Sequence, residues 1–443
     1  MKVKRLPVDP GPAGWNRLLP RPAPAQRLER DITADWLVIG AGYAGLAAAR
    51  RLSQLDPTGR IVVLDAVRVG DGPAGRNSGF MIDLPHDLAS DGYGGSLEKD
   101  RAQTATNRVA IAFAGEMAAE YGLPSEAFAL SGKINGAATA KGHQHNIDYA
   151  RHLAALGEDH RMLDAAEMQA LTGTDYYQGG LFTPGSAMIQ PAMFVRGVAD
   201  GIRSRTVSIY EESPVLDLTA GADWVAKTPK GSVTAPKVIL AVNGHLNSFG
   251  HYSGRLMHVF TYASMTRALT AEECARLGGS AVWGLTPADP MGTTVRRISG
   301  VGGDRIVTRN RFTLDQSMEV PARRIAQVGR DHDRAFAARF PALSGVEVEY
   351  RWGGRLCLSR NNTQVVEEVA PGLFAACCQN GLGTAKGTLA GMCAAELAAD
   401  APSPTAHAML NADKPTRLPP ELLTSTGANI WIRIQERRAG VEM

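Results

Sequence analysis

The chain has 443 residues, of which 44% are hydrophobic and 21% charged, and its formal net charge is only +3. This composition excludes a disordered chain, and the near-neutral charge gives no overall attraction to nucleic acid or to an anionic membrane. We therefore expect a protein of two domains that can bury a large cofactor, with no transmembrane helix, because no apolar run approaches about 18 residues.

The first segment is rich in Pro and Arg and lacks hydrophobic periodicity, which predicts an extended arm on the surface over residues 1–32. Its first residues lead into Pro, Gly and Trp without an apolar core, so we expect no secretory signal. The five cysteines show neither a paired framework nor a CxxC spacing, which favours reduced thiols and a cytoplasmic location.

A strand, a tight turn, a helix and a second strand follow the arm. Residues 36–39 and 61–64 are short apolar runs, and residues 46–55 have the Ala-rich spacing of a helix. This order is a complete βαβ unit, the element from which dinucleotide-binding sheets are built.

The turn of this unit carries the pattern GxGxxG at Gly40, Gly42 and Gly45, and Asp65 lies at the end of the second strand. Gly40 would permit the turn, Gly42 would let a pyrophosphate approach the backbone, and Gly45 would let the helix pack on the strand. Asp65 would accept hydrogen bonds from the adenosine ribose, which favours FAD or NAD over NADP.

Helices and alternating stretches after residue 97 predict a second sheet. The expected helices lie at 98–122, 147–156, 164–171, 319–338 and 384–398, and the expected strands lie within 206–240 and at 259–266, 293–298, 305–312 and 373–376. Glycines at 300–303 would join the strands 293–298 and 305–312 as a hairpin. The amphipathic, basic stretch 430–438 is expected to dock on the protein surface.

Several segments resemble those of the D-amino-acid-oxidase-type FAD-dependent oxidoreductases and occur in that family's order. They are 74–80, 180–184 with 189–191, 238–243, 350–354 and 379–384. Within the family, the chain is similar to the gamma-glutamylputrescine oxidoreductase and glycine oxidase branches, whose members oxidise amines and amino acids.

The resemblance implies an α/β fold, α+β overall, with a Rossmann-like FAD-binding domain and a sheet-containing substrate domain, both discontinuous in sequence. The implied division is an arm at 1–32, an FAD-binding domain at 33–97, 187–256 and 350–401, a substrate domain at 98–186 and 257–349, and a C-terminal extension at 402–443.

The resemblance also implies which residues bind FAD. Residues 76–78 would contact the flavin region, and the turn 381–384 would abut the pyrimidine end of the flavin ring. Backbone N–H groups at the start of the helix at 384 would stabilise the negative charge of reduced flavin. The expected cofactor residues are Gly40, Gly42, Tyr43, Ala44, Gly45, Asp65, Arg76, Asn77, Ser78, Val215, Asn243, Gly381, Leu382, Gly383 and Thr384.

The substrate site departs from the family pattern. Glycine-oxidase-like members hold the substrate carboxylate with an arginine just before the Asn-Gly pair, whereas this chain has Gln379 there. Strand alternation would place Arg305, Arg309 and Arg311 on one face of the strand 305–312. Facing the flavin, they would bind a carboxylate, sulfonate or phosphonate; the alternative is a solvated face. Tyr262, Arg309, Trp352, Arg355 and Gln379 are the pocket candidates, and no catalytic residue is assigned.

Two further sets of residues are candidates for a metal site and for a covalent link to the flavin. His143, His145 and His152 have Gln, Asn and Lys as neighbours rather than further ligands, so we expect no metal site. Cys357 lies near the place where some sarcosine-oxidase-type relatives tether the flavin, but a buried free thiol is the favoured interpretation.

The implied reaction moves a hydride from the carbon that bears nitrogen to flavin N5, and water then hydrolyses the imine to an aldehyde, ketone or keto acid. A dry pocket favours the neutral amine, so no dedicated base is required. Two alternatives stay open: a flavin-dependent 2-hydroxy-acid oxidoreductase with His86 or His258 as base, and a flavoprotein subunit of a larger complex. The expected partners are a small amine or amino acid and oxygen or another electron acceptor.

Overall fold

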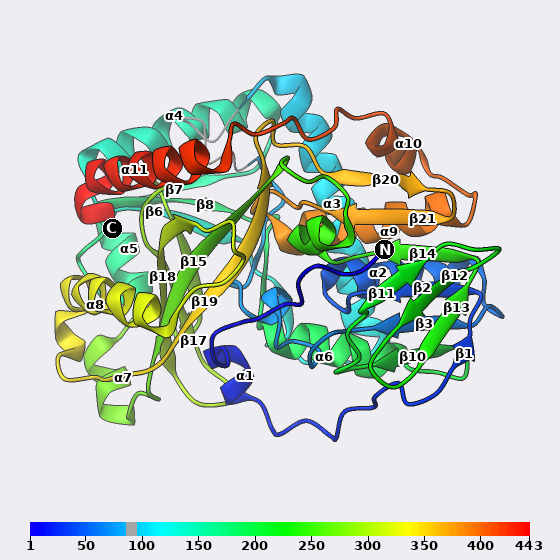
Figure 1. Cartoon of the computed structure of the whole chain (residues 1–443). Helices are drawn as coiled ribbons and strands as arrows, with labels where there is room; N and C mark the ends of the chain where they lie inside the picture. Colours follow the sequence, from blue (N-terminus) through cyan, green and yellow to red (C-terminus); the bar gives the residue numbers. More distant parts are fainter. Residues whose placement is uncertain (86–94) are drawn as a thin grey trace.

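The computed structural model describes residues 1–85 and 95–443, with only the backbone of residues 421–424. Within that part, two large sheets lie side by side (Figure 1). We call them the parallel sheet and the mixed sheet. Among the described helices, none combines the length and apolar character that crossing a membrane requires.

The parallel sheet is built from short apolar strands that are buried on both faces, as is typical of parallel strands. Its order is β10-β3-β2-β14-β21-β20, and β20 runs antiparallel to its neighbour. The strands are β2 (Trp36–Ile39), β3 (Ile61–Leu64), β10 (Val207–Tyr210), β14 (Lys237–Leu240), β20 (Val365–Ala370) and β21 (Leu373–Cys377).

Ala-rich helices cover one face of the parallel sheet. A Cβ at Gly391 of α9 would lie 2.0 Å from the carbonyl oxygen of Ala44 in α2, so small residues let these two helices pack closely. The hydrophobic core on this face includes residues of α2 (Tyr43–Leu55), α3 (Leu97–Glu120), α6 (Pro191–Ile202) and α9 (Gly383–Ala398). The other face packs on a small sheet of β1 (Ile32–Thr33), β13 (Ser232–Ala235), β12 (Trp224–Lys227) and β11 (Asp217–Thr219).

The mixed sheet has the order β19-β15-β18-β17-β16-β6-β8-β7. The hairpin expected around residues 300–304 is present as the antiparallel pair β17 and β18. The strands are β6 (Lys133–Ala137), β7 (Arg161–Leu163), β8 (Gly179–Thr183), β15 (Leu256–Thr266), β16 (Trp283–Pro287), β17 (Thr294–Ile298), β18 (Arg305–Leu314) and β19 (Val348–Ser359). A hydrophobic cluster with Phe260 and Tyr262 packs β15 against α8 (Ala322–Arg339).

The remaining elements connect or cover these sheets. They are α1 (Gly14–Leu18), α4 (Ala140–Leu156), α5 (Ala165–Thr172), α7 (Ala271–Leu277), α10 (Pro404–Leu410), α11 (Glu421–Ala439) and the sheet of β4 (Phe80–Met81), β9 (Ala187–Ile189) and β5 (Phe128–Leu130). Helix α11 docks on β18, where Ile432 packs against Phe312 and Asn429 bonds the backbone of Leu314.

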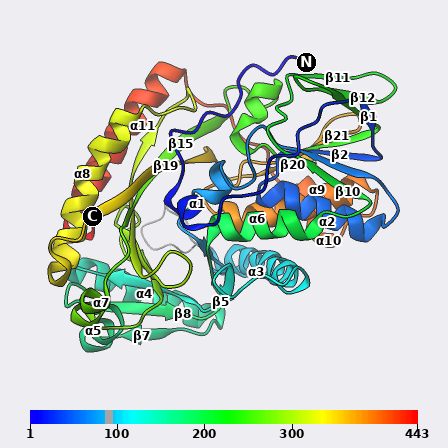
Figure 2. The same ribbon diagram turned by 90° about the horizontal axis from the view of Figure 1, so that it is seen from below.

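The prediction of an extended surface arm is wrong for residues 13–18, most of which are buried, whereas residues 20–27 are mostly exposed. The N-terminal segment crosses between the two large sheets to α1 (Figures 1 and 2), and Ala13 and Trp15 have no exposed surface. Trp15 packs edge-on against Trp352 at 6.3 Å between ring centroids, and its indole N–H donates to the carbonyl of Asn77. Trp15 shares a hydrophobic cluster with Ala192 of α6 and Ala263 of β15, and an isolated tryptophan carries no periodicity that would reveal this contact.

Two elements pack across the domain division that the sequence predicts. Helix α3, assigned from sequence to the substrate domain, packs in the core of the parallel sheet. Strand β19, assigned to the FAD-binding domain, pairs along its length with β15 in the mixed sheet. The mixed α/β fold with two sheet systems is confirmed, while the domain division stays a proposal.

Candidate active site

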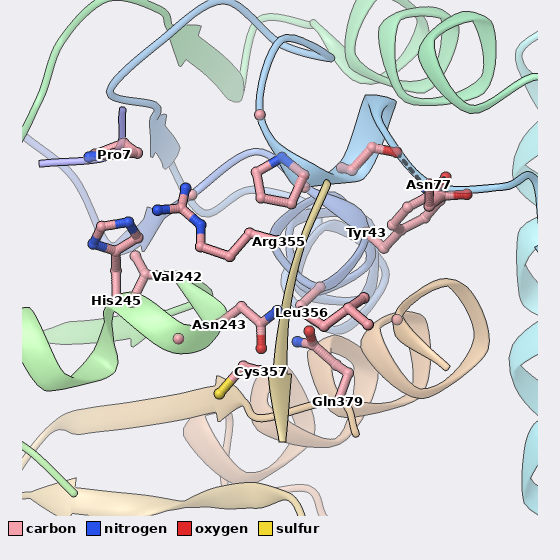
Figure 3. A pocket seen from close by; sticks show the side chains of 18 of the residues that line it. Pro7, Tyr43, Asn77, Val242, Asn243, His245, Arg355, Leu356, Cys357 and Gln379 are labelled. Atoms are coloured by element: carbon pink, nitrogen blue, oxygen red, sulfur yellow. Dashed lines mark hydrogen bonds between the residues drawn. The ribbon is translucent and has the colours of Figure 1, made fainter. Parts of the chain in front are cut away.

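A long cavity lies between the parallel sheet and the mixed sheet, and Figure 3 shows it from close by. The segments that follow β2, β3, β14 and β21 all line it. These strands are parallel, so the cavity occupies the edge formed by their carboxyl ends, which is where ligands bind in open α/β sheets.

The three glycines of the turn after β2 have different surroundings. Gly40 has φ of +106°, and a Cβ there would lie 2.6 Å from the carbonyl oxygen of Ala241. A Cβ at Gly45 would lie 1.7 Å from the carbonyl oxygen of Gly40, whereas a Cβ at Gly42 would meet only the Cβ of Ala74, at 3.5 Å. Gly40 and Gly42 line the cavity and Gly45 does not, so Gly45 serves the packing of α2 alone.

Two helices begin at this cavity without a side-chain cap. The N-cap residues Gly42 of α2 and Leu382 of α9 both lack a capping hydrogen bond, and both line the cavity. The first N–H groups of a helix have no partner within it and attract negative charge. The residues present therefore fit a dinucleotide, with its pyrophosphate at α2 and an electron-rich ring edge at α9.

Asp65, at the end of β3, lines the same cavity. Its carboxylate accepts hydrogen bonds from the N–H groups of Ala41 at 2.7 Å and Val67 at 3.0 Å. Burial nevertheless raises the pKa of Asp65 to about 6. Hydroxyl donors of a bound ribose would stabilise the charged form.

We expect FAD affinity to fall by up to about tenfold per pH unit as the pH drops below about 6, because binding must then displace a proton from Asp65. The raised pKa also means that Asp65 holds its proton more tightly in the cofactor-free fold than in the unfolded chain. As the pH rises through about 6, Asp65 therefore lowers the stability of the cofactor-free fold. Fluorescence titration with FAD between about pH 5 and pH 8 measures the effect, and Asp65→Asn should bind weakly at every pH. A flat profile for the natural chain would refute the role of Asp65.

The segment after β3 supplies two of its three expected cofactor residues. Asn77 and Ser78 line the cavity, and the amide of Asn77 donates to the hydroxyl of Tyr43 at 3.2 Å. The prediction for Arg76 is wrong: its guanidinium donates to the carbonyls of Pro10, Gly11 and Gly353 instead. The other expected residues that line the cavity are Tyr43, Ala44, Val215, Asn243, Gly381, Leu382, Gly383 and Thr384.

The N-terminal segment forms part of the cavity wall, which the sequence did not suggest. Val3, Arg5, Leu6 and Pro7 line it. Asp9 lies between two buried arginines, 3.5 Å from Arg355 and 4.0 Å from Arg76, with its side chain only 9% exposed. The segment is thereby fixed to the fold by charge as well as by Trp15.

Asp9→Asn should lower the free energy of unfolding by about 1–2 kcal/mol, because two buried guanidinium groups lose their shared counter-charge; the long ion-pair distances keep the loss below that of a tight buried pair. Thermal melting with and without FAD measures it. Asp31→Asn, at an exposed position of the same segment, is the matched control. Equal melting temperatures for both variants would show that the Asp9 carboxylate does not hold the segment.

The mixed sheet closes the cavity with a polar wall. Thr286, Thr294 and Arg309 line it from three adjacent strands, β16, β17 and β18. Thr294 and Arg309 are cross-strand partners, so both side chains leave the same face of the sheet. The sequence predicted Arg309 here but neither threonine, since a threonine in a strand carries no distinctive signal.

The two neighbouring arginines of β18 do not share this wall. Arg305 donates to the carbonyls of Gly302 and Thr266 and to Glu349, and Arg311 pairs with Asp331 and Glu436. The register of β15 and β18 shifts beside Arg311, which has φ of +61°. The bulge takes Arg311 off the face that alternation predicts. Arg305 keeps the face of Arg309 but lies beyond the cavity lining.

Two pocket candidates lie outside the cavity lining. Tyr262 is buried toward α8 and its hydroxyl bonds that of Thr313. Trp352 is covered by Trp15 and donates to the carbonyl of Arg76. Arg355 and Gln379 do line the cavity (Figure 3), with Arg355 beside the N-terminal segment and the amide of Gln379 bonding the carbonyl of Ala376.

The histidines and the cysteine that the sequence suggested for base, metal or flavin-tethering roles lie in different places. His86 lies outside the described residues. His258 does not line the cavity, and burial lowers its pKa to about 4. Cys357 lines the cavity as a free thiol, and the adjacent Cys378 together with burial raises its pKa. His152, one of the three clustered histidines, pairs with Asp100 at 2.7 Å.

The chain is similar to known proteins over most of its length. Residues 35–397 match the model of the family described as FAD dependent oxidoreductase, DAO. The chain is 24% identical to the Probable oxidoreductase OrdL of Rhizobium meliloti over 88% of this chain and 89% of that one. It is 27% identical to the Gamma-glutamylputrescine oxidoreductase of Escherichia coli over 76% and 77%. The crystal structure of glycine oxidase from Geobacillus kaustophilus has a similar fold, with a TM-score of 0.66, 19% identity and coverage of 84% and 96%.

Proposed function

Because the chain belongs to the DAO family of FAD-dependent oxidoreductases, we propose that it oxidises a small amine or amino acid that carries an anionic group. The proposal draws on two relatives whose names specify an amine or an amino acid, gamma-glutamylputrescine oxidoreductase and glycine oxidase. The observation that carries it is the polar wall of Thr286, Thr294 and Arg309, which faces the same cavity as the turn after β2.

Bound FAD would supply a hydride acceptor, N5, for the substrate carbon that bears nitrogen, and water would hydrolyse the resulting imine. Arg309 would hold the anionic group of the substrate through charge-assisted hydrogen bonds. Phe80, Pro287 and Leu382, which also line the cavity, would limit the access of water and so favour the neutral amine. The uncapped start of α9 would stabilise negative charge that develops at the cofactor.

An anaerobic screen of the FAD-loaded protein tests the proposal. Amines and amino acids with and without a second acidic group, and the matching 2-hydroxy acids, would be mixed with the protein while flavin absorbance is recorded. We expect bleaching by anionic amines and none by hydroxy acids. Bleaching by hydroxy acids alone would overturn the proposal. In a separate step, reoxidation of the bleached flavin with air or with a quinone would identify the electron acceptor.

We also propose a cytoplasmic location. Its support is that all five cysteines, four of them buried, are free thiols, which suits a reducing compartment.

A further inference from the structure

The polar wall of the mixed sheet continues beyond Thr286 into a buried cluster around Lys133. On β6, Asn135 pairs in register with Thr286 of β16, and Lys133 pairs with Thr183 of β8. Paired residues, and residues two apart on one strand, share a face. Lys133, Asn135 and Thr183 therefore lie on the same face of the sheet as Thr286, Thr294 and Arg309. Only the latter three line the cavity, and Lys133 lies behind Thr286, to which it is hydrogen-bonded.

The opposite face of the same strands is apolar. Ile134, Leu285, Val295 and Ile306 alternate with the polar residues and belong to one hydrophobic core. Lys133 lies on the polar face of the sheet and is buried there, with 3% of the residue exposed. Exposure to solvent therefore does not explain a lysine at this position.

Lys133 is incompletely paired. Its ammonium donates to the side-chain oxygen of Asn135 at 2.5 Å and to the hydroxyl of Thr286 at 3.3 Å, both of which are neutral groups. Within residues 1–85 and 95–443 it forms no ion pair. Burial lowers the pKa of Lys133 to about 8, and the charge of Asp83 offsets only part of that effect. Asp83 itself pairs with Arg108 at 3.0 Å and accepts from Ser186 at 2.9 Å. A buried cation without a counter-charge is strongly unfavourable unless a ligand compensates it.

A second unmatched donor lies beside this ammonium. The amide nitrogen of Asn135 is buried and has no hydrogen-bond partner. The oxygen of the same amide accepts from Lys133 and from Thr286. The hydroxyl of Thr183 is also buried without a partner. The ammonium of Lys133 has only neutral acceptors, and the Asn135 amide and the Thr183 hydroxyl have none. Such a set of donors is suited to the oxygens of an anion.

We infer that Lys133, Asn135 and Thr286 bind a second anionic group of the substrate, so that the enzyme prefers amines with two acidic groups. The inference rests on the proposed function, in which Arg309 holds the first group. Three strand spacings separate the β6 and β18 backbones, about 14 Å, before both long side chains reach inward. The two acidic groups would therefore be separated by several carbons, which makes the substrate longer than a simple amino acid.

The test uses the FAD-loaded protein and non-reactive probes. Linear dicarboxylates from succinate to suberate, each compared with the monocarboxylate of equal carbon number, would be titrated while the flavin spectrum is recorded. For the natural chain we expect one dicarboxylate to bind roughly 10- to 100-fold more tightly than its partner. Lys133→Met should abolish that preference and leave the monocarboxylate affinity unchanged. Lys227→Met, at an exposed lysine of β12, should change neither.

Thermal melting without ligand separates a binding role from a structural one. Lys133→Met removes an uncompensated charge and Asn135→Asp supplies a counter-charge, so both should melt at or above the temperature of the natural chain. Both variants should also lose the dicarboxylate preference. Melting well below the natural chain, with the preference retained, would make Lys133 a structural residue and overturn the inference.

The two proposals fail separately. If anionic amines bleach the flavin but the natural chain shows no dicarboxylate preference, the Lys133 site is wrong and the proposed reaction stands. If dicarboxylates bind through Lys133 but no amine bleaches the flavin, the site stands and the proposed reaction is wrong.

Discussion

Gly42→Val is expected to weaken FAD binding by roughly 10- to 100-fold or more while the protein remains folded. A Cβ at Gly42 meets only Ala74, at 3.5 Å, so the cofactor-free fold can accept a side chain there. The added isopropyl group would instead occupy cavity space at the start of α2, and overpacking of this kind costs about 1–3 kcal/mol. Flavin content after purification and titration of the cofactor-free protein with FAD measure the loss.

Gly45→Ala is the matched control, because it changes a glycine of the same turn that does not line the cavity. Its Cβ would lie 1.7 Å from the carbonyl oxygen of Gly40, so α2 must move away from β2. We expect it to lower the free energy of unfolding by about 3 kcal/mol or more. We therefore expect a folded protein without flavin for Gly42→Val and an unstable one for Gly45→Ala. Normal flavin content in Gly42→Val would contradict this expectation.

Arg309→Met should raise the Michaelis constant for anionic substrates roughly ten- to a hundredfold, because a charge-assisted contact in a desolvated pocket contributes about 1.5–3 kcal/mol. Arg309 lines the cavity from β18, and neither Arg305 nor Arg311 does. Steady-state kinetics with the substrates found in the anaerobic screen provide the measurement.

Two further variants sharpen the test of Arg309. Arg309→Lys keeps the charge but loses the two-pronged geometry of guanidinium, so it should recover part of the affinity. Arg330→Met changes an exposed arginine of α8 and should leave the kinetics unchanged. An unchanged Michaelis constant in Arg309→Met would mean that another group holds the anion.

The sequence predicted the glycine turn and the carboxylate that line the cavity, because these features depend on local pattern. The strand, turn and helix around Gly40 and Gly42, and the position of Asp65, follow from residues close together in the chain. The turn at 381–384 was also identified, since glycines mark it before an Ala-rich helix. These features need no knowledge of tertiary packing.

The side of the cavity formed by the mixed sheet was predicted less well, because it depends on which strands become neighbours. Lys133 and Thr286 are far apart in the chain and meet only because β6 pairs with β16. The bulge at Arg311 removed one arginine from the expected face, and Trp15 covered Trp352. Alternation within one strand cannot reveal a bulge or a segment that packs over the strand from elsewhere.

The most direct test of the central claim is a stoichiometric anaerobic titration of the FAD-loaded protein with its best amine, with product analysis. We expect one equivalent of amine to bleach one equivalent of flavin and to yield one carbonyl product and one released amine or ammonia. A protein that binds no flavin at this cavity, or a flavin bleached by hydroxy acids but by no amine, would contradict this expectation.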